Sequence, residues 1–141
     1  DSEIQKLKDL TGKMIAVQET SKAEEYFLRS DFEGIPDVSL VYCFSNMDEV
    51  FAALRKNYVE AICGHESALI SFINTAPDEY RLLEESFLYS ALGVAFDIQY
   101  DEEFVEELVK TLVDMMNDGT TAAIVGKYGL DAEKSLGRGN D

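Results

Sequence analysis

Short apolar runs alternate along the chain with segments in which apolar residues recur every three or four positions. The apolar runs are rich in β-branched and aromatic side chains, which favours buried strands. They comprise residues 14–17, 38–43 and 59–63, with two further candidates at 81–84 and 92–96. The periodic segments, which predict helices, comprise residues 21–29, 47–54 and 66–73. This alternation predicts an α/β fold, a mostly parallel sheet flanked by helices.

Polar residues that follow the first two strand candidates predict helix caps. Ser21 and Glu24 have the spacing of a capping box. Ser45 precedes the helix that starts near Met47, and we expect Ser45 to cap it.

The segment from Asp101 to Asn117 predicts the longest helix of the chain. The acidic residues 101–103 suit the positive end of its dipole, and Gly119 is typical of a helix C-terminus. One wide face is apolar and carries Phe104, Val105, Leu108, Val109, Leu112, Val113 and Met116. A last short helix is expected from Thr120, which completes a set of C-terminal helices.

Composition and charge exclude several classes of protein. The chain has 141 residues, 46% of them hydrophobic, which is enough for one domain with a core. The formal net charge of −16 argues against nucleic acid as a partner. Two cysteines and one histidine are too few for a structural zinc site, and we expect no metal or cofactor. No signal peptide opens the sequence, which leaves the compartment open.

Three strand-end loops are the best candidates for a binding site. They comprise residues 18–21, 44–46 and 64–66. Ligands of open parallel sheets bind beyond the carboxyl ends of the strands, so these loops are expected to line one edge.

Four segments in this order resemble the bacterial extracellular solute-binding proteins of family 3, which are receptors of polar amino-acid ABC transporters. The segments are LKDLTGKMIAVQETSKAEEYF (7–27), FSNMDEVFAALRKNYVEAICGHESALISFI (44–73), LGVAF (92–96) and NDGTTAAIVGKYG (117–129). The resemblance implies the two-lobed periplasmic-binding-protein type 2 fold. Residues 1–100 correspond to its second lobe. Residues 101–141 correspond to the helical segment that packs on the first lobe, which has no counterpart in this sequence.

The resemblance also implies roles for the loop residues. Thr20 and Ser21 match a hydroxyl pair that meets the ligand carboxylate, and Gln18 matches a glutamine of the family. The alternative for Ser21 is a cap only. Glu19 departs from the small residue usual in the family, and a carboxylate there opposes anion binding.

The second and third loops carry the remaining candidates. Ser45 is in reach of a ligand if it does not act only as a cap. His65 stands where the family has the Asp that holds the α-amino group, and a neutral imidazole lacks that charge. Glu66 replaces that charge only if the loop turns it inward; a solvent-exposed His65 is the simpler expectation.

The family's sheet order places the first strand between Cys43 and Cys63. Two strand spacings are about 9.6 Å, beyond the reach of a disulfide. We therefore expect two buried free thiols.

The leading hypothesis is a non-enzymatic, extracellular or periplasmic binding module that takes up a small polar solute, an amino acid or a relative. In the family the full-length receptor, some members lipid-anchored, delivers its solute to a membrane permease. The alternatives are the outer sensor domain of a membrane-bound signalling protein and an enzyme on the same fold, for which His65 with Glu66 or Glu19 is the one candidate acid/base pair. Without a first lobe to cover it, we expect the apolar helix face to support a homodimer through Phe104, Leu108, Leu112 and Met116.

Overall fold

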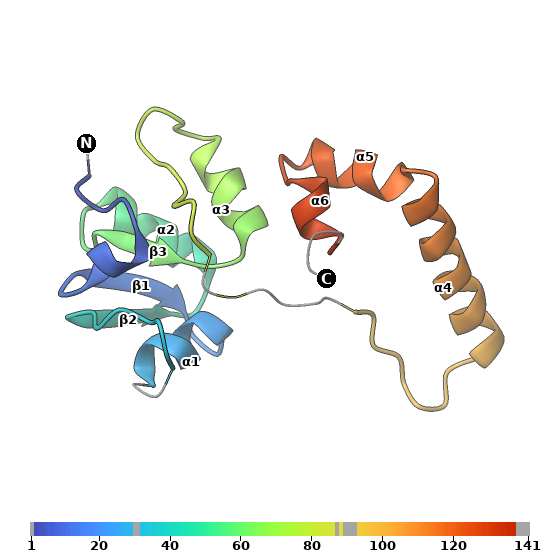
Figure 1. The fold of residues 1–141 in the computed structure, drawn as a ribbon. Helices are drawn as coiled ribbons and strands as arrows, with labels where there is room; N and C mark the ends of the chain where they lie inside the picture. Colours follow the sequence, from blue (N-terminus) through green and yellow to red (C-terminus); the bar gives the residue numbers. More distant parts are fainter. Residues whose placement is uncertain (1, 30–31, 87, 89–92, 138–141) are drawn as a thin grey trace. The chain divides into compact units, whose positions relative to one another are not determined.

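The computed structural model describes residues 2–29, 32–86, 88 and 93–137. The chain divides into two compact units, Asp1–Tyr89 and Ser90–Asp141 (Figure 1). The first unit contains the 3-10 helix η1 (Leu7–Leu10), β1 (Met14–Gln18), α1 (Lys22–Leu28), β2 (Leu40–Phe44), α2 (Met47–Arg55), β3 (Ala61–Cys63) and α3 (Glu66–Ile73). The second unit contains α4 (Glu102–Asn117), α5 (Thr120–Lys127) and α6 (Ala132–Ser135).

The three strands form one parallel sheet in the order β2-β1-β3. The central strand β1 is apolar and its residues Ile15, Ala16 and Val17 are buried, because helices and loops cover both of its faces (Figure 1). The predicted α/β class, with a parallel sheet flanked by helices, is therefore confirmed.

Alternate residues of β1 build two separate parts of the core. Ile15 and Val17 join Ile4 and Leu10 on one face, against which α1 packs through Ala23 and Phe27. Ala16 joins three residues of α2 and its following loop on the other face; they are Val50, Ala53 and Val59. This separation follows from the two-residue period of a strand.

Two predicted strands are wrong in this structure. Residues 81–84 have no strand geometry. The Arg81 guanidinium donates to the carbonyl of Ile4, Leu83 packs on the core, and Glu85 accepts the Leu7 N–H at 2.6 Å. Side-chain contacts therefore hold this segment in place, and not the backbone hydrogen bonds of a β-sheet.

In the candidate at 92–96, residue 92 lies outside the described residues, and residues 93–96 form no strand. Val94 is 63% exposed, whereas the ring of Phe96 lies 5.3 Å from that of Tyr100 and 6.4 Å from that of Phe104. An apolar sequence favours a strand, but it forms a ladder only where another strand offers its backbone.

The second unit is helical. α4 ends at Asn117, and Gly119 follows with a φ of 85°, the left-handed conformation expected of a residue that terminates a helix. None of the described residues of α4, α5 and α6 is buried. The described part of the chain contains no helix that is both long and apolar enough to span a membrane.

Candidate functional site

The strand register brings the first two predicted loops together at the carboxyl edge of the sheet. Gln18 is the register partner of Phe44, and the Glu19 N–H donates to the Phe44 carbonyl at 2.8 Å. The Gln18 side-chain amide reaches the Ser45 carbonyl at 3.5 Å. Gln18 is therefore part of the link between the two loops, in addition to being a candidate ligand contact.

The third loop follows β3 at the same edge, because Cys63 is in register with Val17 of β1. Gly64 allows this loop to pass close to the start of α2. A Cβ at this position would lie 2.9 Å from Cε of Met47. Residues 18–21, 44–46 and 64–66 thus form one continuous strand-end edge, which we call the loop edge.

Ser21 is the N-cap of α1, as its spacing with Glu24 predicts. Its Oγ accepts the Glu24 N–H at 3.2 Å and donates to the Gln18 carbonyl at 2.6 Å. The Glu24 carboxylate in turn accepts the Thr20 N–H at 2.6 Å. A carboxylate of the protein itself therefore occupies the backbone donor that an anionic ligand group would use.

The expectation that Ser45 caps α2 is wrong, because Asn46 is the N-cap. Asn46 Oδ1 accepts the Glu49 N–H at 3.0 Å, and the Glu49 carboxylate accepts the Ser45 N–H at 3.2 Å. Asn46 has the extended backbone of a cap and stands directly before the first helical residue. The Ser45 side chain is left exposed at the loop edge. The Asn-x-x-Glu spacing is the sequence signal that would have identified both residues.

Thr20 adopts a left-handed backbone conformation with a φ of 58°. This conformation is costly for a β-branched residue. Asn57, the other non-glycine described with positive φ, has a φ of 55°, and asparagine tolerates this region. Strain of this kind concentrates at functional sites, and Thr20 is exposed at the loop edge.

The charged candidates of the loop edge all face solvent. His65 stands at the N-cap position of α3 but makes no side-chain cap bond, and Glu19, His65 and Glu66 are exposed. The three loops contain no Lys or Arg. The edge therefore offers carboxylate, hydroxyl and amide oxygens, which suit amino or guanidino groups better than anions.

The two cysteines are free thiols on either side of β1. Cys43 and Cys63 both lie in register with Val17, so the sheet order expected from the family separates them. The expectation of burial is wrong for Cys43, which is exposed because β2 is an edge strand, and Cys63 is only half-buried.

Both thiols are protonated at neutral pH. Burial raises the pKa of Cys63 from 9.0 to about 12. Although Cys43 is exposed, the partial shielding of its thiol from water and then the Glu24 carboxylate raise its pKa from 9.0 to about 11. The thiolate is the nucleophilic form, so neither position is suited to nucleophilic catalysis.

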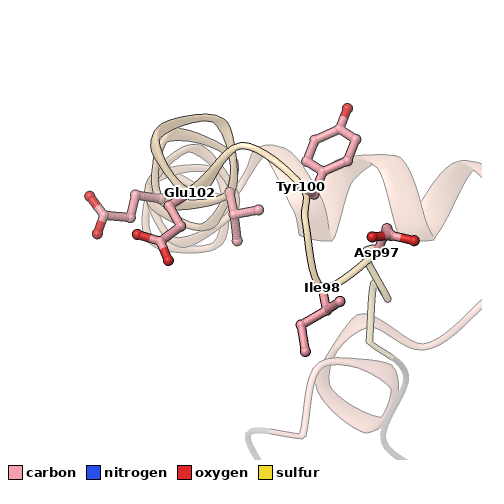
Figure 2. Close-up of a pocket in the computed structure, with 6 residues that line it drawn as sticks. Asp97, Ile98, Tyr100 and Glu102 are labelled. Atoms are coloured by element: carbon pink, nitrogen blue, oxygen red, sulfur yellow. The ribbon is translucent and has the colours of Figure 1, made fainter.

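A hollow in the second unit lies between the loop before α4 and the first turns of that helix. Figure 2 shows its lining side chains Asp97, Ile98, Tyr100 and Glu102 pointing in different directions instead of toward one point. No group of three potential metal ligands occurs among the described residues. The hollow has none of the features of a built site.

A parallel sheet with helices on both faces and its strand-end loops gathered at one edge is typical of open α/β folds that bind ligands beyond the carboxyl ends of their strands. Two solved structures of an ancestral arginine-binding protein, one bound to glutamine and one to arginine, match the chain with 26% identity and a TM-score of 0.66. Each match covers 91% of this chain and 55% of the other, so the chain spans about half the length of these proteins.

The substrate-binding protein of an amino-acid ABC transporter matches at 28% identity over 55% of this chain and 32% of that chain. Its TM-score of 0.46 adds nothing to the fold assignment. No family model and no curated protein matches the chain. The resemblance to the solute-binding proteins of family 3 is nevertheless confirmed at the level of the fold, because the matching structures are amino-acid-binding proteins of that architecture.

Proposed function

We propose that the chain is the second lobe of an extracellular solute-binding protein and that its loop edge contacts a small polar solute, an amino acid or a relative. The observation that carries this proposal is the match of 91% of the chain to a protein solved with arginine and with glutamine. The gathering of three polar strand-end loops supports it. A first lobe supplies the opposing contacts and completes the receptor, which delivers its solute to a membrane permease outside the cytoplasm.

The charges of the loop edge favour its contact with the cationic part of the solute. Glu19 and Glu66 are exposed there, whereas the Thr20 N–H is already bonded to Glu24. A free carboxylate would have to displace Glu24 and approach Glu19 against charge repulsion. We therefore infer that the amino or guanidino group of the solute lies on this lobe.

Binding without catalysis is the second part of the proposal. His65 is exposed, with no side-chain cap bond to orient it, and both thiols have raised pKa values. General acid/base work needs a positioned proton acceptor within hydrogen-bond reach of the substrate. A polar edge that closes over a solute needs no such group.

An NMR titration tests the proposal on the whole chain. Arginine should shift the amide signals of Glu19, Thr20, Ser45 and His65 while leaving those of α4 unchanged. We expect weak binding, with a dissociation constant on the order of 1 mM or higher, because one lobe leaves much of the ligand exposed. Glucose serves as the uncharged control ligand and should shift these signals less.

Two matched variants test the charge argument. Glu19→Gln should reduce the arginine-induced shifts, whereas Glu103→Gln, an equal charge change on α4, should not. Arginine shifts spread evenly over the chain would contradict the proposed site. Equal effects of both variants would show that only net charge matters.

A further inference from the structure

Three hydrogen-bond donors of the first loop are already used within the protein. The Glu19 N–H donates to a carbonyl of β2 at 2.8 Å, and the Thr20 N–H donates to the Glu24 carboxylate at 2.6 Å. The Ser21 hydroxyl donates to the Gln18 carbonyl at 2.6 Å. A solute carboxylate binds by accepting hydrogen bonds, so it would have to displace an existing acceptor at each of these groups.

The Glu24 carboxylate is held in place from two sides. Besides the Thr20 N–H, it lies beside the Cys43 thiol, whose pKa is raised by partial shielding from water and then by this carboxylate. The backbone of Glu24 is fixed as well, because its N–H donates to Ser21 Oγ at 3.2 Å. A solute carboxylate that displaced the Glu24 side chain would therefore break its contacts with both the first loop and β2.

The second loop repeats this arrangement. The Ser45 N–H donates to the Glu49 carboxylate at 3.2 Å, and the two residues are four positions apart, as Thr20 and Glu24 are. The two loops are neighbours, because β1 and β2 end in register. Each of them thus holds a carboxylate of the protein on one of its backbone N–H groups.

The charges near these two carboxylates have the same sign. Glu19 and Glu66 add two exposed carboxylates, and the three loops contain no Lys or Arg. Lys22, the first residue of α1, is bonded to Glu25 at 2.6 Å. Like charges repel, so the loop edge disfavours an anionic group and attracts a cationic one.

We propose that the loop edge selects amines and guanidines and excludes a carboxylate, and that Glu24 and Glu49 set this preference. The inference rests on the proposed function and narrows the solute class to organic cations whose bound end carries no carboxylate. A carboxylate elsewhere on the solute is turned away from this lobe. The decarboxylated form of an amino acid therefore binds this lobe better than the amino acid itself, because specificity follows from the repulsion of the wrong group.

An NMR titration of the whole chain with three related probes tests this inference. Agmatine is arginine without its carboxylate, and argininamide has a neutral amide in place of the carboxylate. Both should bind at the loop edge at least about fivefold more tightly than arginine, as measured from the amide signals of Thr20 and Ser45. If argininamide binds as weakly as arginine, the bulk of the group and not its charge is decisive, which overturns the inference.

Matched variants test the two glutamates. Glu24→Gln keeps an oxygen that accepts the Thr20 N–H but removes the charge, so the preference for agmatine over arginine should fall to about half or less. Glu49→Gln should act in the same direction. Glu33→Gln is the control, because Glu33 lies in the connection from α1 to the start of β2, away from the carboxyl ends of the strands, and should leave the preference unchanged. The amide spectrum of each variant shows whether it keeps the fold.

The outcomes separate this inference from the proposed function. If agmatine and arginine both shift the loop-edge signals with equal affinity, the inference is overturned and the proposed solute site stands. A preference that Glu24→Gln and Glu33→Gln reduce equally reflects net charge alone and also overturns it. If no probe shifts these signals, the proposed function is contradicted and the inference with it.

Discussion

The two units of the chain are stabilised in different ways. In the first unit, β1 is buried between α1 on one face and α2 on the other. The buried hydrophobic residues among the described ones pack on these two faces of β1. In the second, α4 has well-formed ends, with Asp101 as its N-cap and Gly119 after its last turn, but no buried residue. Good local signals thus suffice to define a helix, whereas a stable lobe also needs a sheet on which helices can pack.

The same substitution in the two units gives the largest expected difference. Val50→Ala removes two methyl groups from a fully buried site and should lower the free energy of unfolding of the first unit by about 2 kcal/mol. Val109→Ala, at a site 53% exposed, should change it by less than about 0.5 kcal/mol. Urea unfolding followed by the methyl NMR signals of Ile15 and Val17 measures both. Equal losses would show that the units share one core.

Much of the first unit could be predicted from the sequence, because its signals are local and agree with one another. The Ser21–Glu24 spacing, the apolar run of β1 and the parallel class all appear in the structure. The errors concern features that depend on neighbours. Residues 81–84 have strand-like side chains but pack through Leu83 and Arg81, and Cys43 lies on an edge strand.

At the candidate site, sequence patterns identified the loops but not how their hydrogen-bond groups are used. The bonds from Glu24 to the Thr20 N–H and from Glu49 to the Ser45 N–H join residues four positions apart. Both differ by one residue from the usual capping box, in which the glutamate returns to the cap itself. The left-handed backbone of Thr20 has no sequence signal, because threonine is a poor residue for that conformation.

Cys63 offers a pH test of the packing of the first unit. Its pKa is raised from 9.0 to about 12 by burial, so the folded state holds the proton after the unfolded chain has lost it. The stability linked to this thiol is complete below pH 9 and is lost as the pH rises toward 12. The loss amounts to at most about 1.4 kcal/mol per pH unit.

Urea unfolding at pH 8.5, 9.5 and 10.5 should show this slope in the wild-type chain and a shallower one in Cys63→Ala. Lysines and tyrosines titrate in the same range, and the difference between the two proteins removes their contribution. The α4 signals should not depend on the variant. An identical slope in both proteins would mean that Cys63 is as solvated in the fold as in the unfolded chain.

The smallest expected effect concerns backbone strain, in which the units also differ. Among the described residues, positive φ angles of the second unit occur only at glycines, whereas the first unit has Thr20 at 58° and Asn57 at 55°. Thr20→Asn should relieve strain and raise the free energy of unfolding by about 0.5–1 kcal/mol. Asn57→Thr should lower it by a similar amount, since it introduces the same strain at a site away from the loop edge. If Thr20→Asn stabilises the fold and also reduces the arginine-induced NMR shifts, the strained backbone of Thr20 contributes to ligand binding. Unchanged stability would mean that the first loop holds Thr20 without strain.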